Sequence, residues 1–129
     1  MNERMDSILT SIKKMLGIDE EYTHFDEDII IHINTALYIL SQMGISKEKE
    51  FRIKDKTAKW TDFLESDIKD LDGVKTYVYL KVRLIFDPPS SSAVIDSIKS
   101  TINELEFRLN ASVDTLKTNN LLTNYHKNV

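Results

Sequence analysis

The sequence has no cysteine and, among its 129 residues, three glycines and two prolines. Without cysteine the chain has no disulfide and no thiolate ligand for a metal ion, as is usual for cytosolic proteins. So few glycines and prolines cannot supply the tight turns of an all-β fold, and they favour long helices with few connections. Three glycines also exclude a phosphate-binding loop, a GxGxxG turn and a nucleophile elbow.

Long apolar runs and clusters of basic residues are missing as well. No stretch reaches 18 uninterrupted apolar residues, which excludes a membrane-spanning helix. The N-terminal segment mixes charges of both signs, unlike a signal peptide. The net charge is −4, and residues 1–50 hold ten acidic against five basic side chains. Because phosphate contacts need clustered lysine and arginine, this distribution argues against a protein that reads DNA grooves.

The length fits one domain, and apolar residues recur at helical spacing along most of it. We expect a mainly α fold, a small bundle of four to five helices. The main helices are predicted at about 6–16, 26–43, 70–86 and 92–110. Gly17 and Gly44 follow the first two, as glycine does where a helix closes in the left-handed conformation. Asp26 is expected to cap the second helix at its N-terminus.

Residues 74–86, VKTYVYLKVRLIF, fit two patterns. Alternation of apolar and polar side chains over 77–86 would suit a strand, whereas the spacing of Val74, Tyr77 and Val78 suits a helix. Strands average about 5–6 residues, and no hairpin turn interrupts this longer stretch. Pro88 and the proline after it disfavour helix in the residue before them and so define an end. We therefore predict a helix that is buried on more than one side.

The segment after the second helix changes character. Phe51 and Ile53 alternate with charged residues, and Asp55-Lys56 can form a turn. This pattern predicts a short β-hairpin near residues 51–60. Thr61 is expected to cap a short helical turn that follows it.

The C-terminal part combines a regular helix with an irregular tail. Apolar residues at steps of three and four from Ile95 to Leu109 form a seam like that of a coiled coil, which extends to Leu116 if Ser112 is accepted. Beyond it, KTNNLLTNYHKNV has no periodicity. We expect a helical domain over 1–116 and an extended, flexible tail over 117–129 that orders on a partner.

Candidates for chemistry are few. His24, Asp26, Asp28 and His32 come nearest to a metal cluster, but their spacing matches no zinc motif. Ser90–Ser92 follow two prolines and precede a helix, where capping is the usual role of serine. No carboxylate pair lies in an apolar pattern that would raise a pKa for acid–base work. We expect no enzyme activity, no cofactor and no metal.

Four stretches of the chain resemble a known family. They are ILTSIKKMLGIDEEYTHFDEDIIIHINTALYILSQMGI at 8–45, KWTDFL at 59–64, VKTYVYLKVRLIFDPPSSS at 74–92 and INELEFRLN at 102–110. Together they resemble the head-tail connector (adaptor, or head completion) proteins of long-tailed double-stranded DNA phages and prophages. The similarity runs from about Ser7 to Asn110 and consists of helices and signature residues, with no catalytic motif.

The resemblance implies a structural role in the virion. Such subunits form a homo-oligomeric, dodecameric ring beneath the portal protein, which extends the DNA channel and receives stopper or tail-completion proteins. Genomic DNA would pass through without sequence-specific binding, and no membrane is involved. The protein would be made in the cytoplasm of the bacterial host and act at the head-tail interface.

Three groups of residues are predicted to serve this role. A ring of identical copies buries apolar helix faces between subunits, an apolar tail can anchor on the portal, and channel-facing carboxylates would repel DNA phosphates. The portal-binding residues are predicted to be Leu121, Leu122 and Tyr125. The subunit contact is predicted at Tyr77, Leu80, Leu84 and Phe86. The channel-facing acidic residues are predicted to be Asp19, Glu20 and Glu21.

Two other classes of protein remain open from the sequence. One is a small helical DNA-binding or regulatory protein, against which the missing basic face counts. The other is an antitoxin-like module whose tail folds on a partner.

Overall fold

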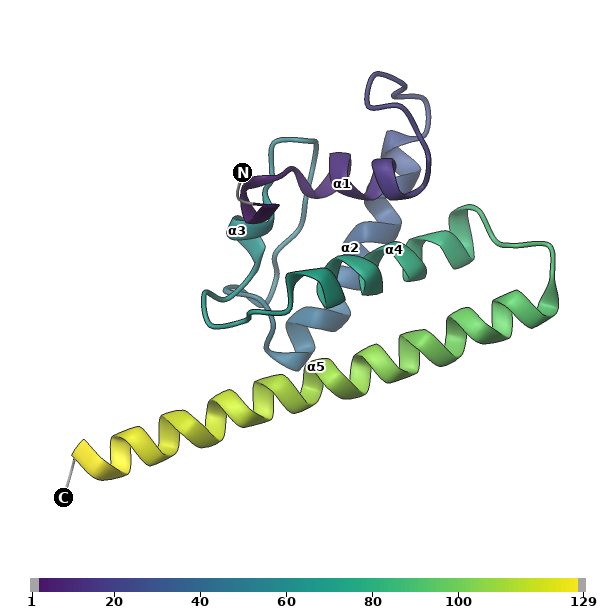
Figure 1. Ribbon diagram of the computed structural model, residues 1–129. Helices are drawn as coiled ribbons and strands as arrows, with labels where there is room; N and C mark the ends of the chain where they lie inside the picture. Colours follow the sequence, from purple (N-terminus) through teal and green to yellow (C-terminus); the bar gives the residue numbers. More distant parts are fainter. Residues whose placement is uncertain (1–2, 128–129) are drawn as a thin grey trace.

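A computed structural model describes residues 3–127 and gives a helical protein with one very long helix (Figure 1). A short 3-10 helix, η1, comes first and is followed by five α-helices. Their bounds are η1 Glu3–Met5, α1 Ile8–Met15, α2 Asp26–Met43, α3 Trp60–Phe63, α4 Leu71–Phe86 and α5 Ser92–Lys127. None of the helices in the described part of the chain is both long and apolar enough to cross a membrane.

Helix α4 lies at the centre of the bundle, as its composition predicts. It packs against α1, α2 and α5, and Val74, Tyr77, Val78 and Val82 have no exposed surface. Asp70 begins the helix by accepting a hydrogen bond from the Gly73 amide at 2.9 Å. The helix ends at Phe86, immediately before Asp87 and the two prolines. The predicted helix over 74–86 is thus confirmed, and three helices of the same chain cover its apolar faces.

Helices α1 and α2 begin and end close to their predicted bounds. The Ser7 hydroxyl caps α1 by accepting from the Thr10 amide at 3.2 Å. Gly44 closes α2 with a φ of 94°, a left-handed conformation that suits glycine. The prediction that Asp26 caps α2 is wrong. Phe25 occupies the cap position without a side-chain hydrogen bond, because the Asp26 carboxylate pairs with Lys13 instead.

Helix α5 runs antiparallel to α4 across one side of the bundle and extends beyond it (Figure 1). Its 36 residues make it about 54 Å long. Ser91 precedes it and accepts from the Val94 amide at 3.4 Å, so this serine has the capping role predicted for it. The buried stripe consists of Ile98, Ile102, Leu109 and Val113. The helix therefore continues well past Asn110. The expected extended tail is instead helical over 117–127, where it forms the exposed last turns of α5, and residues 128–129 of that prediction lie outside the described residues.

The predicted β-hairpin near residues 51–60 is wrong: this segment forms no strand. Its backbone pairs with a side chain instead. The Asn34 amide group of α2 accepts from the Ile53 N–H at 2.8 Å and donates to the Ile53 carbonyl at 3.0 Å. The expected turn does form, since Asp55 accepts from the Thr57 amide at 2.8 Å. Apolar and polar side chains alternate here because the loop lays Ile53 on α2 and leaves its neighbours in solvent. A strand would show the same alternation, but this segment has no partner strand within residues 3–127.

The segment then returns to the core through α3, a single turn. Trp60 is fully buried, and its indole N–H donates to the Ser11 hydroxyl at 3.2 Å. The prediction that Thr61 caps this turn is wrong, because the turn begins at Trp60 and Lys59 occupies the cap position. Its N-terminal amide, that of Lys59, donates to the Asp62 carboxylate at 2.8 Å.

Candidate interaction surfaces

The surface of the described residues offers no metal-binding cluster. No group of three or more His, Asp or Glu side chains within residues 3–127 is placed to hold an ion. In the sequence candidate, Asp26 is engaged by Lys13 at 2.8 Å, and His24 stacks edge-on against Phe25 with ring centroids 4.8 Å apart. The candidate surfaces are therefore ones that could contact a macromolecule.

The acidic loop between α1 and α2 is held in place by a buried lysine. The side chain of Lys13 is 3% exposed, and its ammonium group donates to the carbonyls of Glu20 at 3.0 Å and Tyr22 at 2.8 Å. The same group pairs with the Asp26 carboxylate at 2.8 Å. A buried ammonium with three acceptors fixes both the loop and the start of α2. The carboxylates of the loop consequently stand on an ordered backbone.

Beneath this loop lies a pocket of about 630 Å³ with an apolar floor and acidic edges, named here the acidic pocket. Aromatic contacts join the loop to the end of α4, since the rings of Phe25 and Phe86 meet edge to face at 5.4 Å. Tyr22 is 51% exposed and packs beside Phe25. The pocket is lined by Leu16, Gly17, Ile18, Asp19, Tyr22, Phe25, Phe86 and Asp87.

A second hollow, of about 570 Å³, lies on the outward face of α2 and is named here the α2 groove. Ile31 and Tyr38 stand two turns apart on this face and are 60% and 56% exposed. The segment after α2 forms the other wall. The groove is lined by Ile31, Asn34, Thr35, Tyr38, Glu50, Phe51 and Arg52.

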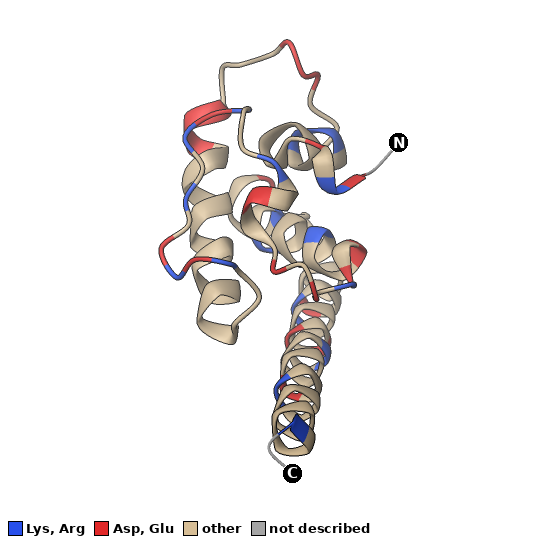
Figure 2. Cartoon of the chain, turned by 90° about the vertical axis from the view of Figure 1, so that its left-hand side faces the viewer, with Lys and Arg blue, Asp and Glu red and all other residues tan. Residues whose placement is uncertain are grey.

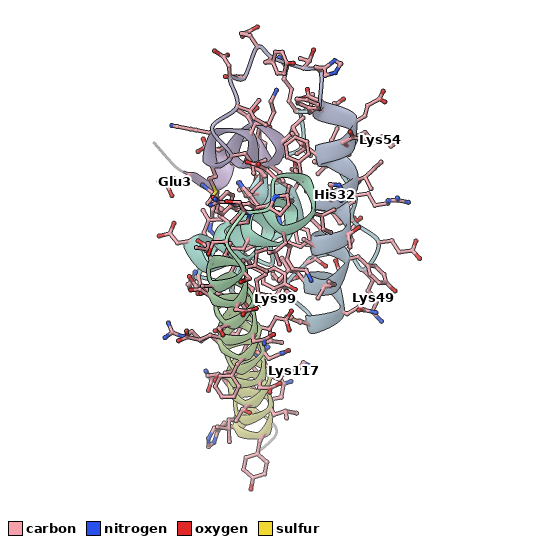
Figure 3. All side chains as sticks on the ribbon, turned by 90° about the vertical axis from the view of Figure 1, so that its right-hand side faces the viewer. Glu3, His32, Lys49, Lys54, Lys99 and Lys117 are labelled. Carbon is pink, nitrogen blue, oxygen red and sulfur yellow. The ribbon has the colours of Figure 1, made fainter. Side chains whose placement is uncertain are left out.

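The segment that forms the other wall of the α2 groove is rich in basic residues, and the groove itself is lined by Arg52 and Glu50. Residues 47–59 carry six lysines and arginines against three acidic residues. Lys49 and Lys54 lie beside α2, on the side remote from α5 (Figure 3). Residues 19–28, by contrast, carry six acidic residues and no lysine or arginine. Figure 2 shows this red region at the top of the molecule, on the loop and the first turn of α2.

The third surface is the outer face of α5. Phe107 is 75% exposed and Tyr125 65%. At the turn angle of an α-helix, Phe107, Leu121 and Tyr125 fall within about 40° of one another, roughly opposite the buried stripe. Leu121 and Leu122 are also exposed, so the three predicted tail residues project from a helix end that no other part of residues 3–127 covers. Their portal-binding role stays a prediction.

The residues predicted for the subunit contact differ in accessibility. Tyr77 and Leu80 lie in the core of their own subunit, whereas Leu84 and Phe86 are partly buried and Ile85 beside them is 62% exposed. The contact stays a prediction, and its accessible members are at the C-terminal end of α4. Asp19 and Glu20 are exposed on the ordered loop, as a channel-facing role requires. That role is also still a prediction.

Tyr77 has a polar partner that sequence reasoning missed. Its hydroxyl donates to the Glu106 carboxylate of α5 at 2.9 Å. Burial, followed by this hydrogen bond and the nearby negative charge, raises the pKa of Tyr77 well above its ordinary value. The contact joins α4 to α5, and no spacing rule links residues so far apart in sequence. Lys13 was missed for a different reason, because two of its acceptors are backbone carbonyls of a loop, which no pattern of side chains marks.

Comparison with known proteins identifies the family. A family described as phage connector protein matches residues 8–115, which is most of the chain. The match spans α1 to α4 and the part of α5 that packs on the bundle, and it ends before the exposed last turns. The chain belongs to the phage connector protein family. No curated protein and no solved structure matches it.

Proposed function

We propose that the chain is a structural subunit of a head-tail connector, without enzyme activity, which assembles as a ring beneath the portal of a phage head. The ring extends the DNA channel and receives stopper or tail-completion proteins. Membership of the phage connector family is the observation that carries this proposal. The described surfaces add support, because they are suited to binding other proteins and hold no cluster of metal ligands.

The exposed end of α5 is the part proposed to grip the portal. Leu121, Leu122 and Tyr125 expose 70%, 53% and 65% of their surfaces, which is costly in water unless a partner covers them. They lie beyond residue 115, where the family match ends. Apolar and aromatic anchors of this kind contribute most of the energy of many interfaces.

The acidic loop is the part proposed to face the DNA channel. Glu20 and Glu21 are exposed, and the backbone of Glu20 is held by buried Lys13. Fixed negative charge repels phosphates, so DNA would slide past without sticking. Cryo-electron microscopy of the assembled ring tests this assignment, and carboxylates of residues 19–21 on the ring exterior would contradict it.

The portal contact is tested by removing residues 117–129. We expect the shortened subunit to fold, because all described residues of this segment are exposed, but to be lost from portal-bearing heads of the phage or prophage that encodes it. The measurement is the amount of subunit that co-sediments with purified heads. A full-length variant with Leu121→Ser, Leu122→Ser and Tyr125→Ser should show the same loss.

A variant with Asn119→Ser and Thr123→Ser is the matched control, since it changes exposed polar residues of the same turns. It should co-sediment like the unchanged protein. If the shortened subunit still joins portal-bearing heads normally, the assignment of the tail is wrong. If the full-length protein joins neither heads nor completed virions, the connector role itself is wrong.

A further inference from the structure

The acidic pocket is a hollow with apolar carbon and two aspartates, Asp19 and Asp87, in its lining. The exposed face of α2 that forms one wall of the α2 groove is an apolar ridge, with Arg52 in the groove and Lys49 and Lys54 beside it. We propose that the pocket and the ridge are the two halves of one subunit contact, in which the ridge of α2 with its basic flank, on one copy, seats against the acidic pocket of the next copy. The proposal rests on the ring of the proposed function and names the surfaces that would close it.

The receiving half is the acidic pocket. Its floor holds Leu16, Ile18 and the edge-to-face pair of Phe25 and Phe86, so an apolar side chain entering it would meet aliphatic and aromatic carbon. Two carboxylates line the pocket, Asp87 at the end of α4 and Asp19 on the acidic loop. Lys13 already holds the loop in place at the edge of the pocket, so the loop would lose little conformational entropy on binding.

The entering half is the outward face of α2. Ile31 and Tyr38 project from it at 60% and 56% exposure, and Phe51 lies beside them with its ring 5.3 Å from that of Phe63. Arg52 lines the groove, and Lys49 and Lys54 lie beside α2 (Figure 3). Glu50 also lines the groove, but basic residues outnumber acidic ones two to one in the segment. A basic rim around an apolar ridge complements an acidic rim around an apolar pocket.

A second copy of the chain is the occupant that these observations favour. Both halves belong to the same molecule but to different faces of it: the acidic loop rises at the upper right of Figure 1, and the segment between α2 and α3 lies at its left. Two different patches that complement each other make a heterologous contact, which repeats from copy to copy and closes if the rotation permits. Phe86, one of the residues predicted for the subunit contact, lines the pocket.

Cysteine cross-linking tests the contact directly, because the chain has no native cysteine. One variant carries Asp87→Cys, a second carries Arg52→Cys, and both side chains are exposed in the isolated subunit. Mixed under oxidising conditions, the two should give covalent dimers, and the double variant should give a ladder of higher species. Arg52→Cys mixed with Lys99→Cys, whose cysteine would lie on an exposed position of α5, is the control and should give few dimers.

The reaction is run both on subunits assembled on purified heads and on concentrated free protein. Dimers from the Asp87→Cys and Arg52→Cys pair, well above the control, support the contact in either setting. If subunits assemble on heads but this pair cross-links no better than the control, the surfaces are wrongly assigned while the connector role stands. If no subunits assemble on heads, the connector role fails, and the free protein still decides the contact by the same comparison.

A charge exchange provides an independent measurement. Asp87→Arg alone or Arg52→Asp alone places like charges across the contact and should lower subunit assembly on heads by about tenfold. Both changes in one chain restore opposite charges and should recover most of the assembly. Recovery in the double variant is not expected of a change that merely disturbs folding. Equal assembly by all four proteins would overturn the proposal.

Discussion

Tyr77 and Lys13 bring polar groups into the core, and each has its partners outside its own helix. The Tyr77 hydroxyl reaches the Glu106 carboxylate at 2.9 Å, and the Lys13 ammonium reaches two loop carbonyls and Asp26. Buried polar groups stabilise a fold only when they are hydrogen-bonded, so both contacts help to specify one arrangement of the helices.

Tyr77 is expected to make the protein sensitive to alkali. Its pKa is raised in the folded state, so folded protein keeps the proton that the unfolded chain releases above about pH 10. Stability from this group is fully present below pH 10 and is lost as the pH rises further, by up to about 1.4 kcal/mol per pH unit. Urea unfolding of the unchanged protein and of Tyr77→Phe at pH 9 to 11 measures this difference.

The phenylalanine variant should lose about 1 kcal/mol at neutral pH, because the hydrogen bond is gone. Above pH 10 it should fall less steeply than the unchanged protein. Tyr38→Phe, at a hydroxyl on the exposed face of α2, is the control and should keep the steep dependence. Parallel curves for the unchanged protein and Tyr77→Phe would show that Tyr77 does not cause the loss.

At the scale of the element, Gly44 does two things at the end of α2. Its φ of 94° is open to glycine, and a Cβ built there would lie 3.3 Å from the Cγ1 of Val113 on α5. Gly17 closes α1 with a φ of 79° and has open space around it. The two glycines therefore separate the cost of backbone strain from the cost of crowding against a neighbouring helix.

Gly17→Ala should cost about 1 kcal/mol of unfolding free energy from strain alone. Gly44→Ala should cost more, about 2 kcal/mol, since the methyl group also crowds the Val113 side chain. Chemical denaturation gives both values. In a Val113→Ala background the extra cost at Gly44 should shrink, whereas that at Gly17 should not. Equal costs for Gly44→Ala with and without Val113 would remove the packing role.

The sequence allowed most helices to be predicted because their cues are local. Asp70 and the proline pair bound α4, and the glycines bound α1 and α2. Residues 51–60 were mistaken for a hairpin because a loop lying on a helix shows the same alternation as a strand, and only the Asn34 contact distinguishes them. The Tyr77 contact could not be predicted, since it depends on which distant helices the fold brings together. The Lys13 contacts could not be predicted either, since they depend on the path of an irregular loop.

At the scale of the whole molecule, the chain divides into a packed body and an overhanging helix end. Deletion of 117–129 should leave the unfolding free energy within about 0.5 kcal/mol, as expected for exposed residues. Deletion of 109–129 should lower it by about 3 kcal/mol or more, because Leu109 and Val113 leave the core. Urea unfolding of both shortened proteins tests this division, and a large loss in the first would show that the overhang packs on the body.

The direction of α5 also determines how the subunit would bear a mechanical load. Its last turns, residues 117–127, project about 16 Å past the packed part, at the rise of an α-helix. A pull along the helix axis loads the contacts of Ile98, Ile102 and Leu109 together, in shear. A sideways pull at the tip would instead peel them one after another, starting from Val113. A partner that grips the tip in line with α5 thus meets a stiffer response than one that pulls it sideways.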